Sequence, residues 1–303
     1  MNGEETLRPP WGWVAWAVGR LRWPALGFLG RLLGVMAGRI LRIRRGQVER
    51  AMRRAGVASP PAQAAAMYRS LGTSVFEFLW LAARGDAAMN HVSIDPPSRA
   101  RWQAALALNR GAVIAASHTG NWDLAACAMA RAIELLVVTK RLGVASLDRF
   151  WQTARARQGV WLASGRGAMA RARAVLARGG AVAMMIDQVP DSARHAVRVP
   201  FLDGLAWVDR AAATLAARAG SPLVVAASRR DGRGGHVLEV LEVHVPPRRA
   251  GRSWIDQATS AATRALDRFV RAYPSQWLWL HRRWREPRGA PVDPFPETAT
   301  LPR

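Results

Sequence analysis

"AVIAASHTGNWDLAACAMARAIELLVVT", residues 112–139, contains an apolar run of strand length, a polar loop, a helix-length segment and a second apolar run. The alternation continues downstream, and the strand-length runs lie at 112–117, 134–139, 159–164, 181–187, 222–228 and 236–243. Strands that alternate with helices predict an α/β fold, a single domain with a mostly parallel sheet flanked by helices. "RRDGRGGH" (229–236) predicts a turn between the last two strands, because it is rich in glycine.

Helical segments precede and follow this alternating region. Residues 44–90 predict helices broken at Ser59-Pro60-Pro61, "DPPSR" (95–99) opens another helix, and a final helix ends before Pro274. No repeat or linker divides the 303 residues. We therefore expect an N-terminal segment (1–43), one domain (44–286) and a Pro-rich tail (287–303).

The N-terminal segment combines tryptophan with arginine. Tryptophans 11, 13, 16 and 23 are interleaved with arginines 20, 22, 31 and 39. Apolar rings at the acyl boundary and cations on headgroups are typical of an amphipathic interfacial segment, so we predict that residues 11–43 associate with a membrane. The arginines and Pro24 interrupt any 18-residue apolar span, which disfavours a simple transmembrane helix. The leader "MNGEETLRPP" is not typical of a signal peptide. An ordinary amphipathic core helix remains the alternative.

The chain is strongly basic, with 44 Lys and Arg against 21 Asp and Glu, a formal net charge of +23. Such a surface attracts phosphates, acidic proteins and anionic membranes. Nucleic acid is not an expected partner, because the arginines are spread along the whole chain and no standard binding motif is present. Cys127 is the only cysteine, and no His/Cys/Asp cluster has zinc spacing, so we expect no internal disulfide and no metal site.

His118 follows the first strand of the opening stretch, where ligands bind in open α/β sheets. Gly120 permits a tight turn, Asn121 can cap the next helix, and Asp123 falls in its first turn. A histidine facing a carboxylate across such a turn can act as a general base. A buried histidine satisfied by a neighbour explains the bare spacing equally well, and His281 has the same spacing to Glu286.

A second motif predicts different chemistry. A strand, Gly165-x-Gly167-x-x-Ala170, a helix and a second strand ending in Asp187 imitate a dinucleotide-binding fingerprint. Two features weaken this interpretation. The unit follows two earlier strands instead of opening the sheet, and residues 164–167 can be a plain loop.

Several collinear segments resemble one protein family. "SHTGNWDLAA" is similar to the H-x4-D/E block of the bacterial late lipid A acyltransferases (lauroyl and myristoyl transferases), relatives of the glycerolipid acyltransferases. Further similar segments are "VVTKRLGVASLDRFW", "GGAVAMMIDQ", "VRVPFLDG", "ATLAARAGSPLVVAAS" and "PSQWLWLHRRWR". Together they cover roughly residues 10–285 in the family's order. The chain departs from the family pattern in "RRGQVERAMRRAG", in Phe201-Leu202-Asp203-Gly204 and in "LAWVDRAAAT".

The resemblance implies transfer of a fatty acyl group from an acyl carrier protein thioester to a hydroxyl of a phosphorylated lipid A precursor. It implies no cofactor, residues 44–286 as the acyltransferase domain, and attachment to the cytoplasmic face of the bacterial inner membrane through its anionic lipids. His118 would be the base and Asp123 its orienting carboxylate, with Asp187 as another candidate partner. The implied substrate-binding residues are Gly120, Asn121, Lys140, Arg141, Asp187, Gln188 and Phe201, of which Lys140 or Arg141 would hold a phosphate or oxyanion.

Three alternatives remain open at this point. The acceptor can be another glycolipid or an amino-lipid. The protein can be a dinucleotide-dependent oxidoreductase using Gly165, Gly167 and Asp187. It can also be a non-catalytic basic protein that binds membrane or nucleic acid.

Overall fold

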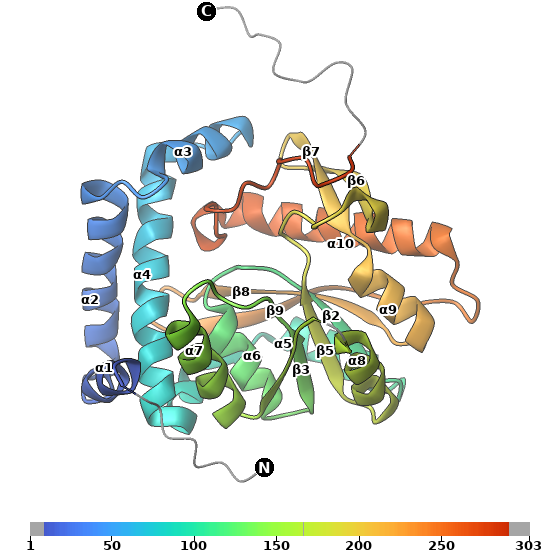
Figure 1. Ribbon diagram of the computed structural model, residues 1–303, viewed down its shortest axis with the longest axis horizontal. Coiled ribbons are helices and arrows are strands. Elements are labelled where there is room, and N and C mark those ends of the chain that lie inside the picture. The colour runs from blue at the N-terminus through green and yellow to red at the C-terminus, as the bar shows by residue number, and fades with distance from the viewer. Residues whose placement is uncertain (1–8, 166, 291–303) are drawn as a thin grey trace, which may run out of the picture.

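A seven-stranded sheet forms the centre of the fold in the computed structural model, which describes residues 9–165 and 167–290 (Figure 1). The strand order is β1-β9-β8-β2-β5-β3-β4, and only β8 and β9 pair antiparallel. The strands are β1 (Val92–Ile94), β2 (Ala112–Ala116), β3 (Leu135–Val138), β4 (Val160–Ala163), β5 (Ala181–Met185), β8 (Leu223–Arg230) and β9 (His236–His244). The predicted α/β class and all six predicted strands are therefore confirmed, together with the turn between β8 and β9.

Helices cover both faces of this sheet, which is why the central strands β2 and β5 are apolar on both sides. In β2, Ala112 and Ile114 pack toward α5 (Pro96–Leu106) and α6 (Trp122–Ala130). The alternate residues Val113 and Ala115 belong to a core with α8 (Ala168–Ala177), α9 (Ala211–Ala219) and α10 (Arg252–Ala272). On the first face, α7 (Ala145–Arg157) packs through Phe150 and Ala154 into a cluster with Leu124 and Cys127 of α6.

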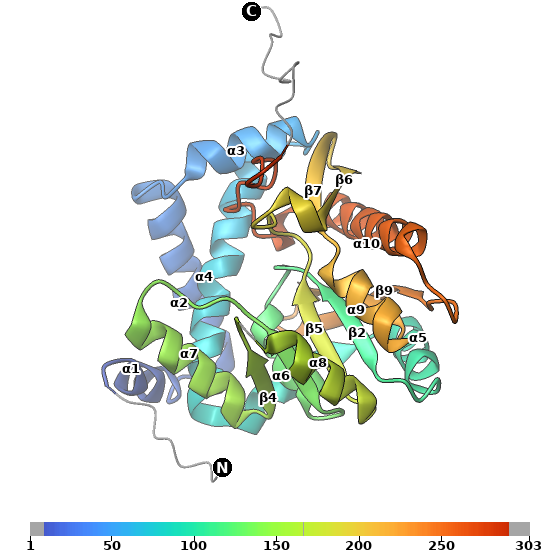
Figure 2. The same cartoon turned by 45° about the vertical axis from the view of Figure 1, so that its right-hand side comes forward.

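Four N-terminal helices lie along one side of the sheet. They are α1 (Trp11–Val18), α2 (Trp23–Val35), α3 (Arg45–Arg54) and α4 (Pro60–Arg84), with a π-helical turn η1 (Met36–Ile40) continuing α2. Figures 1 and 2 both show α2 lying alongside α4. Glycines permit this contact, since a Cβ on Gly30 would lie 2.2 Å from Thr73 Cα and one on Gly72 would lie 2.2 Å from the Gly30 carbonyl. The 3₁₀ turn η2 (Gly85–His91) then leads to β1.

Within the described ranges, no single helix has the length and hydropathy of a membrane span. One pair of consecutive helical segments, Trp23–Ile40 and Arg45–Arg54, is long and apolar enough when taken together, but the two segments are bent by 88° relative to each other.

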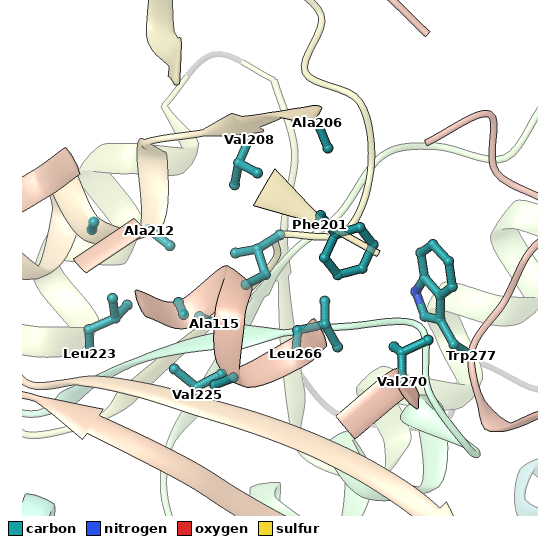
Figure 3. Packing of buried hydrophobic residues seen from close by; sticks show 14 of the residues in the cluster. Ala115, Phe201, Ala206, Val208, Ala212, Leu223, Val225, Leu266, Val270 and Trp277 are labelled. Atoms are coloured by element: carbon teal, nitrogen blue, oxygen red, sulfur yellow. The ribbon is translucent and has the colours of Figure 1, made fainter. Parts of the chain in front are cut away.

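A separate antiparallel hairpin, β6 (Ala196–Phe201) and β7 (Gly204–Asp209), was not among the predicted strands. Leu202 and Asp203 form its two-residue turn, both with positive φ. The hairpin follows the 3₁₀ turn η3 (Ala193–His195), and its residues Phe201, Ala206 and Val208 pack on the core beside α10 (Figure 3). After α10, the short turn η4 (Pro274–Gln276) brings the chain back to the sheet, where Thr119 and Trp277 form an isolated bridge.

The division at residues 43 and 286 stays a prediction. Of its outer parts, the leader up to residue 8 and most of the Pro-rich tail, residues 291–303, lie outside the described residues.

Candidate active site

His118 lies at the carboxyl end of the central strand β2 and contacts Asp187, which follows the neighbouring strand β5. The register pairs Ala116 with Met185, so the two strands end side by side and their next side chains meet. His118 Nδ1 lies 2.9 Å from Asp187 Oδ1, and the His118 backbone N–H donates to Oδ2 at 2.8 Å. One carboxylate thus holds both the ring and the backbone of His118.

Asp187 is fully buried, and Trp277 Nε1 donates a third hydrogen bond to its Oδ2 at 2.9 Å. Burial alone would raise the pKa of Asp187, but the charge and hydrogen bonds of His118 hold it far below its usual range. Burial likewise works to lower the pKa of His118, but the charge and hydrogen bond of Asp187 outweigh it and raise that pKa above 6.5. The ionised carboxylate therefore keeps a proton on Nδ1 and leaves Nε2 as the basic atom.

Asp123, the expected orienting residue, contacts a different side chain. Arg155 of α7 donates to its Oδ1 from Nε at 2.7 Å and from Nη2 at 2.5 Å, and both side chains are largely buried. Within the described part of the chain, no hydrogen bond joins Asp123 to His118. The expected direct contact between Asp123 and His118 is therefore wrong, because the first turn of α6 directs Asp123 toward α7. The Asp123 carboxylate affects His118 only by its charge, which helps to raise the pKa of the imidazole.

A cavity of about 700 Å³ opens beside His118. One part of its lining is apolar and comes from α6, α7, β5 and the C-terminal segment: Trp122, Leu147, Trp151, Met184, Met185 and Leu278. The other part is polar: His118, Thr139, Lys140, Arg141, Gln152, Arg155, Gln188, Asp209 and His281. Of the residues predicted from the sequence, the cavity thus gathers His118, Lys140, Arg141 and Gln188.

The predicted cavity-lining polar residues differ in how firmly they are held. Gln188 Nε2 lies 3.4 Å from His118 Nε2, so the amide donates toward the unprotonated nitrogen. Lys140 is largely exposed and pairs with Asp191 at 2.8 Å, and Arg141 beside it is also exposed. These two cations therefore lie at the solvent side of the cavity, with side chains free to reorient toward a ligand.

Gly120, Asn121 and Phe201 do not line this cavity. Gly120 has φ +55, and a Cβ there would lie 2.6 Å from the Ser228 carbonyl, so it shapes the loop. Asn121 caps α6 by accepting from Leu124 N at 3.2 Å. Phe201 is buried, and its ring lies 5.4 Å from that of Trp277 (Figure 3). These residues support the site from behind.

A buried ionic cluster, which sequence analysis missed, holds the Asn121 cap in place. Glu77 of α4 accepts from Asn121 Nδ2 at 2.9 Å, from Arg230 Nη1 at 2.6 Å and lies 3.0 Å from His236 Nε2. Burial alone would raise the pKa of Glu77, but the His236 hydrogen bond and the Arg230 charge lower it to about 2. The only sequence signal was a single acid in the apolar run "SVFEFLWLAA".

The C-terminal segment supplies a second histidine. The ring of His281 lies 4.9 Å from that of His118, and its Nε2 is buried without a hydrogen-bond partner among the described residues. Burial, followed by the nearby positive charge of His118, lowers the pKa of His281 to about 4, so it is neutral near pH 7. Glu286, which has the same spacing from His281 as Asp123 has from His118, accepts from Trp207 Nε1 at 2.5 Å and orients neither histidine.

A family model for the bacterial lipid A biosynthesis acyltransferases matches residues 12–286. The chain belongs to this family. Membership makes it an acyltransferase of lipid A biosynthesis, which implies an acyl donor and a lipid acceptor, and it confirms the resemblance read from the sequence. Among proteins of curated function, the comparison finds no match.

Family membership overturns both alternative classes, the oxidoreductase and the non-catalytic binding protein. The fold gives a physical reason in the first case. In a dinucleotide-binding unit, the strand before the glycine loop and the strand that ends in the acid are neighbours in the sheet. Here the glycines follow β4 and Asp187 follows β5, and β3 lies between these two strands. Asp187 is moreover enclosed by His118 and Trp277 and faces no ribose site.

Proposed function

We propose that the protein transfers a fatty acyl group from an acyl carrier protein thioester to a hydroxyl of a phosphorylated lipid A precursor, with His118 as general base. The observation that carries this proposal is the two-point contact between His118 and Asp187, which leaves Nε2 facing the cavity. Asp187 is the orienting carboxylate, in place of Asp123.

The reaction follows from this geometry. His118 Nε2 takes the proton of the acceptor hydroxyl as its oxygen attacks the thioester carbonyl. The tetrahedral intermediate then breaks its C–S bond, and the imidazolium returns the proton to the departing thiolate. Asp187 stabilises the imidazolium between the two steps. The Gln188 amide lies close enough to donate to the developing oxyanion.

The apolar part of the cavity suits the acyl chain. Leu147 and Trp151 of α7 and Met184 and Met185 of β5 line the same cavity as His118. Methionine side chains adapt to irregular apolar ligands. A thioester carbonyl beside His118 would therefore place its alkyl chain along this wall.

The cations at the cavity mouth suit anionic substrates. Lys140 and Arg141 are exposed there and can meet a phosphate of the acceptor or the acidic carrier protein. The net charge of +23 favours encounter with both partners and with anionic inner-membrane lipids.

Attachment to the cytoplasmic face of the inner membrane is proposed for residues 11–43. Their outer surface exposes large apolar side chains, with exposed fractions of 70% for Trp13, 61% for Trp16, 58% for Phe28 and 51% for Leu32. The Arg20 guanidinium stacks on the Trp16 ring at 3.0 Å. Exposed aromatic rings with an arginine beside them are suited to the headgroup region.

The test is acyl transfer by purified, folded variants, with the product identified by mass spectrometry. The His118→Ala variant should lose roughly 10²–10⁴-fold or more in turnover, because the base is removed. His195→Ala changes an exposed histidine outside the cavity and is the matched control. Near-normal turnover by the His118 variant would refute the mechanism. A product linkage that resists mild alkali would show an amide and therefore an amino-lipid acceptor.

A further inference from the structure

A second cavity, of about 430 Å³, lies between α2, η1, α3 and α4, and the proposed reaction does not use it. Four arginines line it, namely Arg39, Arg42, Arg45 and Arg69, against one acid, Glu49. The lining therefore carries a net charge of +3. Concentrating arginines around one hollow is electrostatically unfavourable unless an anion enters it.

Among the residues that the structure describes, three of these four arginines have no acidic partner. Arg45 donates to Glu49 at 2.7 Å and to the carbonyls of Gly38 and Pro61, so its position is fixed. Arg39, Arg42 and Arg69 form no hydrogen bond or ion pair through their side chains with another residue in the described ranges. Their guanidinium groups are therefore available to a ligand. Arginine forks match the oxygens of a phosphate in a bidentate manner.

The backbone around this cavity is unusual. η1 is a π-helical turn, a feature frequent at functional sites. Arg42 and Arg44 then both adopt positive φ, at 51° and 53°, which is uncommon for residues other than glycine. Arg44 Nη1 donates to the Leu280 carbonyl, which anchors the turn to the C-terminal segment. The unfavourable backbone conformations at η1, Arg42 and Arg44 therefore lie in the same short segment as Arg39 and Arg42 of the cavity.

Exposed apolar residues lie next to two of the cavity arginines in the sequence. Met36 and Ile40 lie on either side of Arg39 in η1 with exposed fractions of 45% and 70%, and Leu41 and Ile43 adjoin Arg42 with 61% and 48%. Apolar side chains and cations therefore alternate over a few residues. A lipid headgroup presents the complementary order, with its phosphate just above the acyl boundary.

We propose that this arginine cavity binds the phosphate of an anionic membrane phospholipid, with Arg39, Arg42 and Arg69 as its ligands. The inference rests on the membrane attachment proposed above and deepens it, because it adds one defined headgroup site to a general apolar surface. It does not depend on the catalytic role of His118.

The experiment measures binding of the full chain to phosphatidylcholine vesicles, with and without a fraction of phosphatidylglycerol. The triple variant Arg39→Gln/Arg42→Gln/Arg69→Gln should bind phosphatidylglycerol vesicles about tenfold or more weakly than the wild type. The control Arg218→Gln/Arg248→Gln/Arg249→Gln removes the same charge at exposed sites outside the cavity and should change binding about twofold at most. Thermal unfolding of each variant confirms that it is folded.

A charge-conserving variant separates a site from a general field. Arg39→Lys/Arg42→Lys/Arg69→Lys keeps the three charges but loses the guanidinium forks, so it should lose most of the phosphatidylglycerol preference. Wild-type binding by this variant, or equal losses in the two glutamine triples, would overturn the proposal. Inorganic phosphate that binds the free protein as tightly as the vesicles do would also overturn it.

Two further outcomes show whether the membrane attachment or only the headgroup site is wrong. If the wild type binds no vesicles, both the membrane attachment and this inference fail, whatever the acyl-transfer assay gives. Turnover in detergent without phospholipid should be unaffected in the glutamine triple. A tenfold rise in the KM for a phosphorylated acceptor, with unchanged vesicle binding, would assign the cavity to the acceptor instead.

Discussion

Asp187→Asn and Asp123→Asn test which carboxylate positions His118. In the first variant an amide replaces a fully buried carboxylate that accepts three hydrogen bonds. The single amide oxygen cannot accept all three, and the amide NH₂ can hold the imidazole in the wrong tautomer. The imidazolium also loses its counterion. We expect kcat to fall roughly 10²–10⁴-fold.

The pH dependence of activity in the same variants separates a positioning role from misfolding, because loss of folded protein lowers activity without shifting the pH at which it rises. Asp187 raises the pKa of His118, so wild-type activity should rise with pH through a limb above 6.5. Removal of the carboxylate leaves burial as the main influence and lowers that pKa. The residual activity of Asp187→Asn should therefore show its limb at lower pH than the wild type.

Asp123→Asn should act mainly on stability. It leaves the buried Arg155 guanidinium without its partner, which costs about 3–5 kcal/mol for a buried pair. Because the Asp123 charge also raises the pKa of His118, although less than Asp187 does, the activity limb should shift slightly in the same direction. We expect folded Asp123→Asn to keep turnover within about tenfold of the wild type.

The assay is steady-state acyl transfer across pH, with thermal unfolding measured on each sample. Trp277→Phe is an additional variant that keeps the carboxylate and removes the indole donor at 2.9 Å together with part of a buried ring. Its loss in kcat should be smaller than that of Asp187→Asn, with some loss of stability. Near-normal kcat for a folded Asp187→Asn, together with a large loss and unchanged stability for Asp123→Asn, would refute the assignment.

Three other predictions concern the rest of the molecule. Glu77→Gln should destabilise the protein by about 3 kcal/mol near pH 7. Because the folded-state pKa of Glu77 is about 2 against 4.5, wild-type stability should fall as pH drops from 4.5 toward 2, and acid titration of the variant should show a smaller fall. Lys140→Ala and Arg141→Ala should reduce activity with unchanged thermal unfolding, because both side chains are exposed; full activity of both variants would remove the pair from the mechanism. Trp13→Ser/Trp16→Ser should weaken vesicle binding in cosedimentation with turnover on soluble substrates unchanged, and undiminished binding would place the attachment elsewhere.

The sheet could be predicted because most of its strands are apolar runs that alternate with helix-length segments. β1 has only three residues, too few for an apolar run to stand out. β6 contains Pro200, which argues against a strand in sequence but is accommodated in a two-stranded hairpin. The N-terminal helices were predicted, but their glycine contacts with α4 become visible only when the helices pack.

The site could be predicted only in part, because sequence spacing reports local contacts. His118 was found from its place after a strand. Asp187, which the family resemblance alone suggested as a partner, lies 69 positions away and is brought there by the register of β2 and β5, whereas the local candidate Asp123 faces α7. Trp277 and His281 reach the site from the far end of the chain through the bridge to Thr119. Hydrophobic periodicity and motif spacing do not predict a bridge between residues this far apart in the sequence.

The contact between Asp187 and Trp277 joins residues that are synthesised far apart in time. Trp277 leaves the ribosome 90 residues after Asp187, and His281 follows it. A nascent chain that has completed the sheet and α10 already holds His118 and Asp187, yet it lacks the indole donor and the second imidazole. The candidate site therefore cannot have its full set of contacts until the chain has been synthesised through His281, whereas a chain that ends at α10 already contains both His118 and Asp187.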